Sequence, residues 1–268
     1  MKRTFFPSLL FFLFLTAGCE MIDYHPYDVD ISGETDINRR NIARIETQCL
    51  GKDTLRFITM GDSQRWYDET LDFVNQVNLR SDIDFVIHGG DLSDFGVTDE
   101  FLWQRDILNR LKVPYVALIG NHDCLGTGEE TFTKVFGSPN FSFIAGRVKF
   151  VCLNTNAIEY DYSRPIPDFN FIEDEQTSRS DEFDRTVICM HIRPYMDEFN
   201  NNVARVFQHY VSNFPGILFC TAAHEHRVYQ EDIFDDGILY YVSDCMKHRN
   251  YNVFTLTPDG YGHEVVYY

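Results

Sequence analysis

Basic side chains are scarce in this sequence. Its 268 residues contain 23 Lys and Arg against 41 Asp and Glu, which gives a formal net charge of −18 at pH 7. No run of basic residues follows Arg3. Proteins that wrap nucleic acid neutralise its phosphates with clustered Lys and Arg side chains. We therefore expect no nucleic-acid-binding surface.

Several other features that would define a protein class are also missing. No two cysteines stand in Cys-x-x-Cys spacing, so a structural zinc finger is not expected. No internal repeat, low-complexity block or second linker follows residue 55. The sequence is nevertheless rich in aromatic residues, with 24 Phe and 15 Tyr, which a disordered acidic chain would lack. The length and composition favour one large α/β domain.

The first 18 residues have the pattern of an export signal. Lys2 and Arg3 precede the apolar run 5–15, which is too short to span a bilayer comfortably. The small residues 16–18 then precede Cys19. This arrangement resembles a bacterial lipoprotein signal, which implies that Cys19 is lipidated and anchors the mature chain to a membrane, on its periplasmic side or at the cell surface. The alternative is an ordinary secretory signal in which Cys19 has no role.

An exported chain can form disulfides, and six cysteines follow Cys19. Three of them, Cys152, Cys189 and Cys220, lie inside apolar runs of strand length. Free cysteine in such a run behaves as a small core hydrophobe. We therefore predict buried thiols at these three positions.

The rest of the chain divides into two parts. Residues 19–50 are polar and are expected to form a tether followed by a short helix, whereas residues 51–268 form the folded domain. Apolar runs of strand length occur at 55–60, 85–88, 115–119, 148–153, 187–190, 217–220, 238–242 and 253–256. Helical periodicity at 67–79 and 99–111 separates the first three runs. This alternation predicts βαβ units around a parallel sheet.

Polar clusters directly follow these apolar runs. They are Asp62-Ser63-Gln64, Asp91 to Asp94, Asn121-His122-Asp123, His191 and His224-Glu225-His226. Ligands of such sheets bind beyond the carboxyl ends of the strands, so five segments deliver these side chains to one rim. Mixed oxygen and imidazole donors suit divalent metals of the Mn, Fe or Zn type. Each cluster alone is equally typical of a turn or a surface histidine.

Taken in order, the clusters resemble the motifs of the calcineurin-like metallophosphoesterase family over residues 57–226. The resemblance implies an α/β fold in which a β-sandwich is flanked by helices, in four αββα layers. It also implies two divalent metal ions as cofactors. One ion is held by Asp62, Gln64, Asp91 and His226, and the other by Asp91, Asn121, His191 and His224, with Asp91 as the bridge.

The same resemblance implies roles for residues that do not bind metal. His122 is expected near the phosphate, where it stabilises charge or protonates the leaving oxygen, with Asp123 as the neighbour that orients it. Separately from the resemblance, the position of Arg65 beside Gln64 makes it a candidate contact for the substrate phosphate, and the alternative is a solvated arginine at the rim. Two positions depart from the family pattern: Ala223 replaces a glycine, and Gln64 replaces a histidine ligand. Gln64 either coordinates through its amide oxygen or only forms a hydrogen bond nearby.

These observations predict a phosphoric ester hydrolase, either a phosphatase or a phosphodiesterase, in which a hydroxide that bridges the two metals attacks the phosphorus. A phosphate ester is its expected substrate, and the bound ions offset the acidity of the chain. The alternative is a catalytically weak or inactive binding lipoprotein with the same fold, which only Gln64 supports. A thiol enzyme based on Cys124 is disfavoured because no motif positions a separate base for it.

Overall fold

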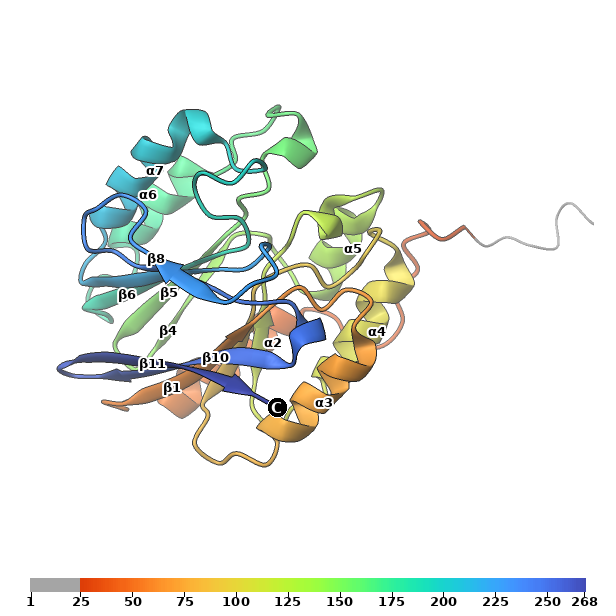
Figure 1. Cartoon of the computed structure of the whole chain (residues 1–268), viewed down its shortest axis with the longest axis horizontal. Helices are drawn as coiled ribbons and strands as arrows, with labels where there is room; N and C mark the ends of the chain where they lie inside the picture. Colours follow the sequence, from red (N-terminus) through yellow and green to blue (C-terminus); the bar gives the residue numbers. More distant parts are fainter. Residues whose placement is uncertain (1–24) are drawn as a thin grey trace, which may run out of the picture.

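The computed structural model describes residues 25–268. The expected export signal and Cys19 lie outside these residues. Among the residues described, no helix combines the length and the apolar character needed to cross a bilayer. The described chain folds into two β-sheets that pack face to face, with helices on their outer faces (Figure 1).

The first sheet contains the first three expected strands and a carboxyl-terminal hairpin. Its strand order is β11-β10-β1-β2-β3. The members are β1 (Leu55–Met60), β2 (Phe85–His88), β3 (Tyr115–Ala117), β10 (Asn250–Thr257) and β11 (Gly260–Tyr267). Strands β1, β2 and β3 run parallel, as expected, whereas β10 and β11 pair antiparallel.

The second sheet has the order β4-β5-β6-β7-β9-β8. The members are β4 (Phe141–Ala145), β5 (Val148–Leu153), β6 (Arg185–Met190), β7 (Ile217–Ala222), β8 (Tyr229–Glu231) and β9 (Tyr240–Val242). The four central strands are parallel, and the edge strands β4 and β8 are antiparallel to their neighbours. Both sheets are thus mixed, because the parallel core carries antiparallel strands at its edges.

Helices complete the outer layers. Helices α3 (Tyr67–Val77), α4 (Thr98–Leu108) and α5 (Gly128–Val135) cover the first sheet, and α6 (Phe169–Thr177) and α7 (Ala204–Ser212) cover the second (Figure 1). Short 3₁₀ helices also occur at η2 (His122–Cys124), η3 (Ile158–Tyr160), η4 (Asn201–Val203) and η5 (Met246–His248). The family fold of two sheets flanked by helices is therefore present.

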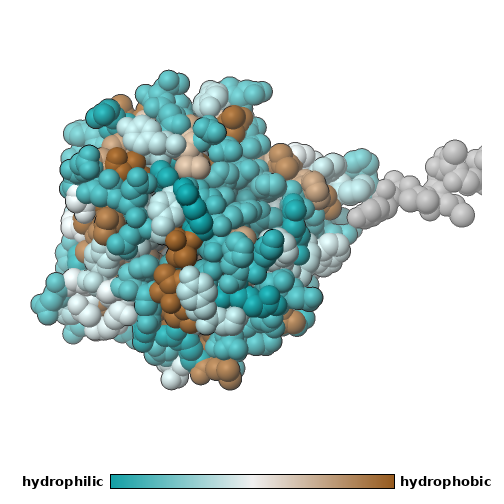
Figure 2. Space-filling model, in the orientation of Figure 1, coloured by the Kyte–Doolittle hydropathy of each residue, from teal (hydrophilic) through white to brown (hydrophobic). Residues whose placement is uncertain are grey.

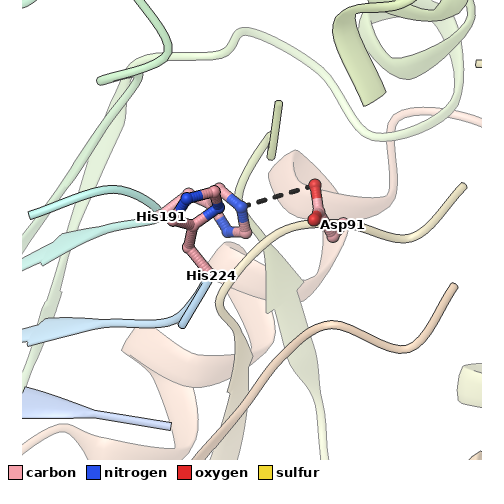
Figure 3. Close-up of side chains that lie close together, drawn as sticks. All are labelled: Asp91, His191 and His224. Carbon is pink, nitrogen blue, oxygen red and sulfur yellow. Dashed lines mark ion pairs between the residues drawn. The ribbon is translucent and has the colours of Figure 1, made fainter. Parts of the chain in front are cut away.

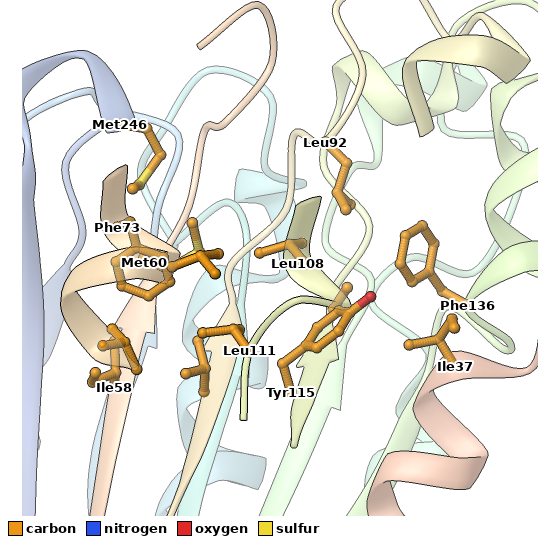
Figure 4. Close-up of a cluster of buried hydrophobic side chains, with 14 of the residues drawn as sticks. Ile37, Ile58, Met60, Phe73, Leu92, Leu108, Leu111, Tyr115, Phe136 and Met246 are labelled. Atoms are coloured by element: carbon orange, nitrogen blue, oxygen red, sulfur yellow. The ribbon is translucent and has the colours of Figure 1, made fainter. Parts of the chain in front are cut away.

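Three hydrophobic clusters fill the three interfaces between these four layers. Successive side chains of a strand point to opposite faces. On β1, Phe57 accordingly points between the sheets, while Ile58 points to α3 and α4. Figure 4 shows the cluster on this helical side. On β5, Phe150 faces the first sheet and Val151 faces α6 and α7.

Helix α2 (Ile37–Cys49) corrects the expected domain boundary at residue 51. Its residue Ile37 is buried with the helices of the first sheet, and Ile45 is buried between the two sheets. The Asn38 side chain also exchanges hydrogen bonds of 2.8 Å with the backbone of Ala117 in β3. The expected short helix is therefore part of the core and is not a component of a tether.

Candidate metal centre

The loops that follow β1, β2, β3, β6 and β7 meet at one rim of the sandwich. They bring together the expected ligands Asp62, Gln64, Asp91, Asn121, His191, His224 and His226. Four of these, Asp62, Asp91, His224 and His226, have left-handed backbone conformations with φ between 50° and 73°. Such strained conformations persist where the surrounding structure fixes them, and they concentrate at functional sites.

Two glycines allow the loops to approach so closely. A Cβ atom on Gly90, whose φ is 107°, would lie 2.6 Å from Nδ1 of His191. A Cβ atom on Gly120 would lie 2.1 Å from Oδ1 of Asp91. Any side chain at these two positions would clash with His191 or Asp91, so glycine is needed for the loops to pack this closely.

Four side chains converge on a single point at the second expected metal position. Oδ1 of Asn121 lies 3.0 Å from both Nε2 of His191 and Nδ1 of His224. Oδ1 of Asp91 lies 3.4 Å from Nε2 of His191. Figure 3 shows the side chains of Asp91, His191 and His224 turned toward one another. One donor atom from each of these three residues lies within 4.8 Å of the others, which is compatible with a shared cation.

The outer nitrogens of both imidazoles are held by acceptors. Nδ1 of His191 lies 2.8 Å from the carbonyl oxygen of Gly89, and Nε2 of His224 lies 3.0 Å from Oε2 of Glu198. A carbonyl or a carboxylate can only accept here, so each outer nitrogen carries the proton. The inner nitrogen is then the one that can present a lone pair to a bound cation, as a metal ligand requires. Sequence analysis did not identify Glu198.

Asp91 and His191 form a fully buried pair. Burial is the largest single influence and opposes ionisation of both groups, but their mutual attraction, together with smaller contributions from His122, Asp62 and the backbone of Gly89, outweighs it. The pKa of Asp91 is consequently lowered to about 2, and the pKa of His191 is raised to about 9. A divalent cation at this position would take the place of the imidazole proton.

The first expected metal position contains buried oxygen atoms without partners. Oδ1 of Asp62 and Oε1 of Gln64 are buried and accept no hydrogen bond from any residue in the described part of the chain. The amide nitrogen of Gln64 instead donates to Oδ2 of Asp91 over 3.2 Å, which leaves Oε1 free. Nε2 of His226 lies 3.4 Å from Oδ1 of Asp62. A buried polar atom without a partner is costly, so a cation fits this set of donors.

His122 is positioned by Asp94. Its Nδ1 lies 2.8 Å from the carbonyl oxygen of Asp94, so this nitrogen donates the hydrogen bond. The backbone N–H of His122 donates to Oδ1 of Asp91 over 3.0 Å. The Asp94 carboxylate lies near the same imidazole and also pairs with Arg65. Nε2 of His122 thus remains available at the rim.

The hydrogen bonds of Asp123 within residues 25–268 do not include one to the imidazole that it was expected to orient. Its buried carboxylate accepts hydrogen bonds of 2.8–2.9 Å from the backbone N–H groups of Asp91, Leu92, Ser93 and Gly120. No described hydrogen bond joins that carboxylate to the imidazole of His122. Asp123 therefore binds the loop after β2 to the loop after β3, and it does not orient the catalytic candidate beside it.

Three other expectations have clear outcomes. Ala223 does not have a positive φ, so replacing the family's glycine causes no backbone strain there. Cys152, Cys189 and Cys220 are free and buried, as predicted. The thiol of Cys124 donates to the carbonyl oxygen of Gly120, and burial raises its pKa well above the usual value. A thiolate nucleophile is thus disfavoured at Cys124.

A cavity of about 240 Å³ opens beside the first metal position. The expected residues Gln64, Arg65, His122 and His226 line one side of it. The other side is formed by Trp66 and by residues 245, 247 and 248, in the segment that follows β9. Sequence analysis did not assign this segment to the site, because it carries none of the recognised motifs.

The sequence of residues 55–228 matches the calcineurin-like phosphoesterase family. This match covers more than half of the chain and includes every expected metal ligand. The chain belongs to this family.

Individual relatives of this calcineurin-like phosphoesterase are distant. A 3′,5′-cyclic-nucleotide phosphodiesterase from Nostoc sp. is 31% identical over 84 residues. The aligned segment covers 31% of this chain and 32% of that relative, or about a third of its length.

Solved structures support the fold over a longer stretch. A dimetal phosphatase from Danio rerio has a TM-score of 0.59 at 14% identity, and the alignment covers 80% of this chain and 99% of that one. GAP50, described as the anchor in the inner membrane complex of Plasmodium, has a TM-score of 0.63 at 12% identity, with 81% and 85% covered. At such identities these likenesses establish the fold of the calcineurin-like phosphoesterase and nothing further.

Proposed function

We propose that this protein hydrolyses phosphoric esters, as a phosphatase or a phosphodiesterase, with two divalent metal ions of the Mn, Fe or Zn type. The observation that carries the proposal is the donor set at the rim. Within residues 25–268, buried oxygens of Asp62 and Gln64 lack hydrogen-bond partners, and the inner nitrogens of His191 and His224 face Asn121. Such a set of oxygen and imidazole donors is suited to these cations.

The ligands divide between two positions that share Asp91. Asp62, Gln64 and His226 would hold one ion with it, and Asn121, His191 and His224 would hold the other. When bound, two such ions supply Lewis-acid polarisation of phosphoryl oxygens and activation of a water molecule for in-line attack. Positive charge concentrated there also attracts an anionic ester to an acidic chain.

His122 is proposed to act on the leaving oxygen. Its Nδ1–H is held by the Asp94 carbonyl, so Nε2 is the atom that faces the substrate. With both ring nitrogens protonated, His122 would give its Nε2 proton to the leaving oxygen as the phosphorus–oxygen bond breaks, and Nδ1 would keep its own proton. Arg65, which shares Asp94 as a partner and lines the same cavity, is proposed to contact the ester.

A second candidate is a binding or scaffold protein that retains the fold without turnover. Gln64 at a position where the family has histidine favours it, and the structural neighbour in Plasmodium is described as an anchor. The fixed tautomer and free Nε2 of His122 favour the hydrolase, because holding metal alone does not require this residue. We therefore place hydrolysis first.

We further propose that the protein is exported and anchored through lipidated Cys19. The support is the pattern of residues 1–19, in which basic residues, an apolar run and small residues precede a cysteine. The site would then act on esters outside the cytoplasm.

The decisive experiment compares the wild-type protein with Asp91→Asn. Each is loaded separately with Mn, Zn or Fe and tested against a panel of phosphomonoesters and phosphodiesters, and bound metal is counted by elemental analysis. We expect close to two ions per wild-type chain, together with hydrolysis of at least one ester. Asp91→Asn should lose activity and most of the metal. A wild-type protein that is active without metal would contradict the proposal, and one that binds metal without turnover would favour the scaffold.

A further inference from the structure

We propose that Lys247, with His248 and Arg65, forms a subsite for a second anionic group, carried by the part of the substrate that leaves. The preferred substrates would then be phosphoric esters whose leaving alcohol bears its own carboxylate or phosphate. The claim that the leaving group occupies this subsite rests on the proposed function. The claim that the subsite binds an anion rests on the geometry of the cavity alone.

The charge of the cavity lining is opposite to that of the chain. Among the residues described, those that line it include Arg65, Lys247 and three histidines, and no Asp or Glu. This is notable in a sequence with 41 acidic residues and a net charge of −18. A concave surface with basic groups focuses a positive potential that attracts anions. Because Arg65, His226 and His248 each pair with an Asp carboxylate, Lys247 is the lining residue that gives the cavity the charge of an anion site.

Lys247 supplies positive charge that no acidic residue offsets. Within residues 25–268, no ion pair or side-chain hydrogen bond engages its ammonium, which lies 5.5 Å from the ring centroid of Trp66. Other basic residues near the rim are paired: Arg65 with Asp94, and Arg249 with Asp72. A cation–π contact fixes the direction of the side chain without neutralising it. The ammonium therefore remains able to bind a ligand anion.

His248 is held in place beside Lys247. Its Nδ1 lies 2.8 Å from Oδ1 of Asp244. The other carboxylate oxygen of Asp244 accepts a hydrogen bond of 3.0 Å from the side chain of Asn250. A carboxylate that accepts a hydrogen bond from one ring nitrogen fixes the orientation of the imidazole. Nε2 of His248 is then the nitrogen left for a ligand, and it donates to an anion when the imidazole carries a proton on both nitrogens.

The segment that carries both residues is attached directly to the metal-binding loop. Cys245 pairs with Gly61 in an isolated parallel bridge, and the backbone N–H of Met246 donates to the carbonyl oxygen of Asp62 over 3.3 Å. Met246 itself is fully buried in the cluster between the first sheet and its helices (Figure 4). The subsite is therefore fixed relative to Asp62.

The position of His122 indicates which part of the ester the subsite receives. His122 lines the same cavity, and its Nε2 is the proposed proton donor to the leaving oxygen. A group attached to that oxygen would extend toward Arg65 and Lys247. The volume of about 240 Å³ is below that of typical small-molecule sites, roughly 300–1,000 Å³, so a compact leaving group fits better than a macromolecule.

A cation in the same place is the competing interpretation. Donor atoms of Asp244, Cys245 and His248 lie within 4.8 Å of one another. Both oxygens of Asp244 already accept hydrogen bonds, from the backbone of Cys245, from His248 and from Asn250. The cluster therefore has no unsatisfied oxygen of the kind seen at Asp62, which favours the anion.

The test uses non-hydrolysable ligands that differ only in the second anion. Binding of phenylphosphonate and 4-carboxyphenylphosphonate, and of propylphosphonate and 3-phosphonopropionate, is measured by calorimetry on the Mn-loaded protein. We expect the carboxylated member of at least one pair to bind on the order of 3- to 10-fold more tightly, the size of one partly exposed charge contact. Lys247→Met, which keeps an unbranched apolar side chain beside Trp66, should remove this preference.

The matched control is Lys134→Met. Lys134 lies on α5, is paired with Glu130 and does not line the cavity. The control should keep the wild-type preference. Equal binding of both members of both pairs by the wild type would overturn the proposal, as would an unchanged preference in Lys247→Met. A third bound metal ion that is lost in Cys245→Ser would also overturn it, because a cation would then hold the anion.

A second experiment measures the hydrolysis rates of phenyl phosphate and 4-carboxyphenyl phosphate. If the proposed function holds, kcat/KM should favour the carboxylated ester in the wild type and not in Lys247→Met. If neither ester, nor a diester analogue of each, is hydrolysed, the hydrolase proposal fails while the calorimetry still decides the subsite. The two failures are therefore distinguishable.

Discussion

The carboxylate of Glu198 lies 3.0 Å from Nε2 of His224, on the opposite side of the imidazole from Asn121. A carboxylate that accepts from the outer nitrogen orients a ligating histidine and increases its basicity. Glu198→Ala should therefore weaken metal binding at the second position by about 10- to 100-fold, and Glu198→Gln should weaken it less, because its amide oxygen still accepts. Titration with Mn and Zn, followed by calorimetry, measures the effect.

The control for Glu198 is its exposed neighbour Asp197. Asp197→Ala should bind metal as the wild type does. If Glu198→Ala also retains wild-type affinity, the contact with His224 has no role in orienting the ligand.

His122→Ala should retain its metal while kcat falls by about 10²- to 10⁴-fold, the usual contribution of a general acid. The reason is that Nε2 of His122 is free at the rim, whereas the expected ligands point to the two metal positions. Steady-state kinetics and elemental analysis of the same preparation provide the measurement. His209→Ala, an exposed histidine on α7, is the control. Loss of metal in His122→Ala would mean that this residue is a ligand.

Gln64→Ala should lower occupancy of the first metal position and leave the second largely filled. Its buried Oε1 has no protein partner in the described part of the chain, which is the state expected of a ligand atom. Gln64→His should bind the first ion more tightly and shift preference toward Zn or Fe, because imidazole is the stronger donor to these ions. Metal titration of both variants is the measurement. Unchanged stoichiometry and affinity in Gln64→Ala would remove this residue from the ligand set.

Phe150→Ala should cost about 3–5 kcal/mol in free energy of unfolding. Phe150 is fully buried between the sheets, and the ring centroids of Phe57, Phe85 and Phe143 lie 4.9–5.3 Å from its own. Urea unfolding measures the change. Leu79→Ala, at an 82% exposed position, should change the stability by less than about 0.5 kcal/mol. A similarly small loss in Phe150→Ala would show that this interface contributes little.

Cys19→Ser should release the protein from the membrane fraction or stall its processing. A single acyl chain anchors only marginally, whereas the several chains of a bacterial lipoprotein anchor firmly. Fractionation of cells that express the wild type or the variant measures this directly. Recovery of the wild type entirely in soluble fractions would contradict lipid anchoring.

Strands in the interior of the sandwich were predictable from the sequence. The boundaries of β1, β2 and β5 agree with the apolar runs, because strands buried on both faces are mostly apolar even where a polar residue such as Arg56 or Lys149 interrupts them. The edge strand β8 was missed because it has only three residues, and β11 was missed because it is partly exposed and contains two glycines. Exposed edges carry a weak hydrophobic pattern.

The candidate site was predictable where each motif directly follows a buried strand. Asp62, Asp91 and Asn121 are such cases. Asp123 shows where the sequence misleads, because its adjacency to His122 suggests a contact, whereas the fold directs the carboxylate to backbone amides. Glu198 and Lys247 could not be predicted, since their proximity to the site depends on segments that no periodic pattern places.

The single methyl group of Ala223 sets the spacing between the two halves of the rim. A Cβ atom on Gly61 or Gly89 would lie 2.8 or 3.0 Å from that methyl, so both glycine backbones pack directly against it. Gly61 and Gly89 follow strands of the first sheet, and Ala223 follows β7 of the second. The separation between the loop of Asp62 and the loop of His224 is therefore a property of the scaffold. A larger residue at position 223 would increase the distance between Asp62 and His224. It would therefore alter both proposed metal positions without replacing any ligand.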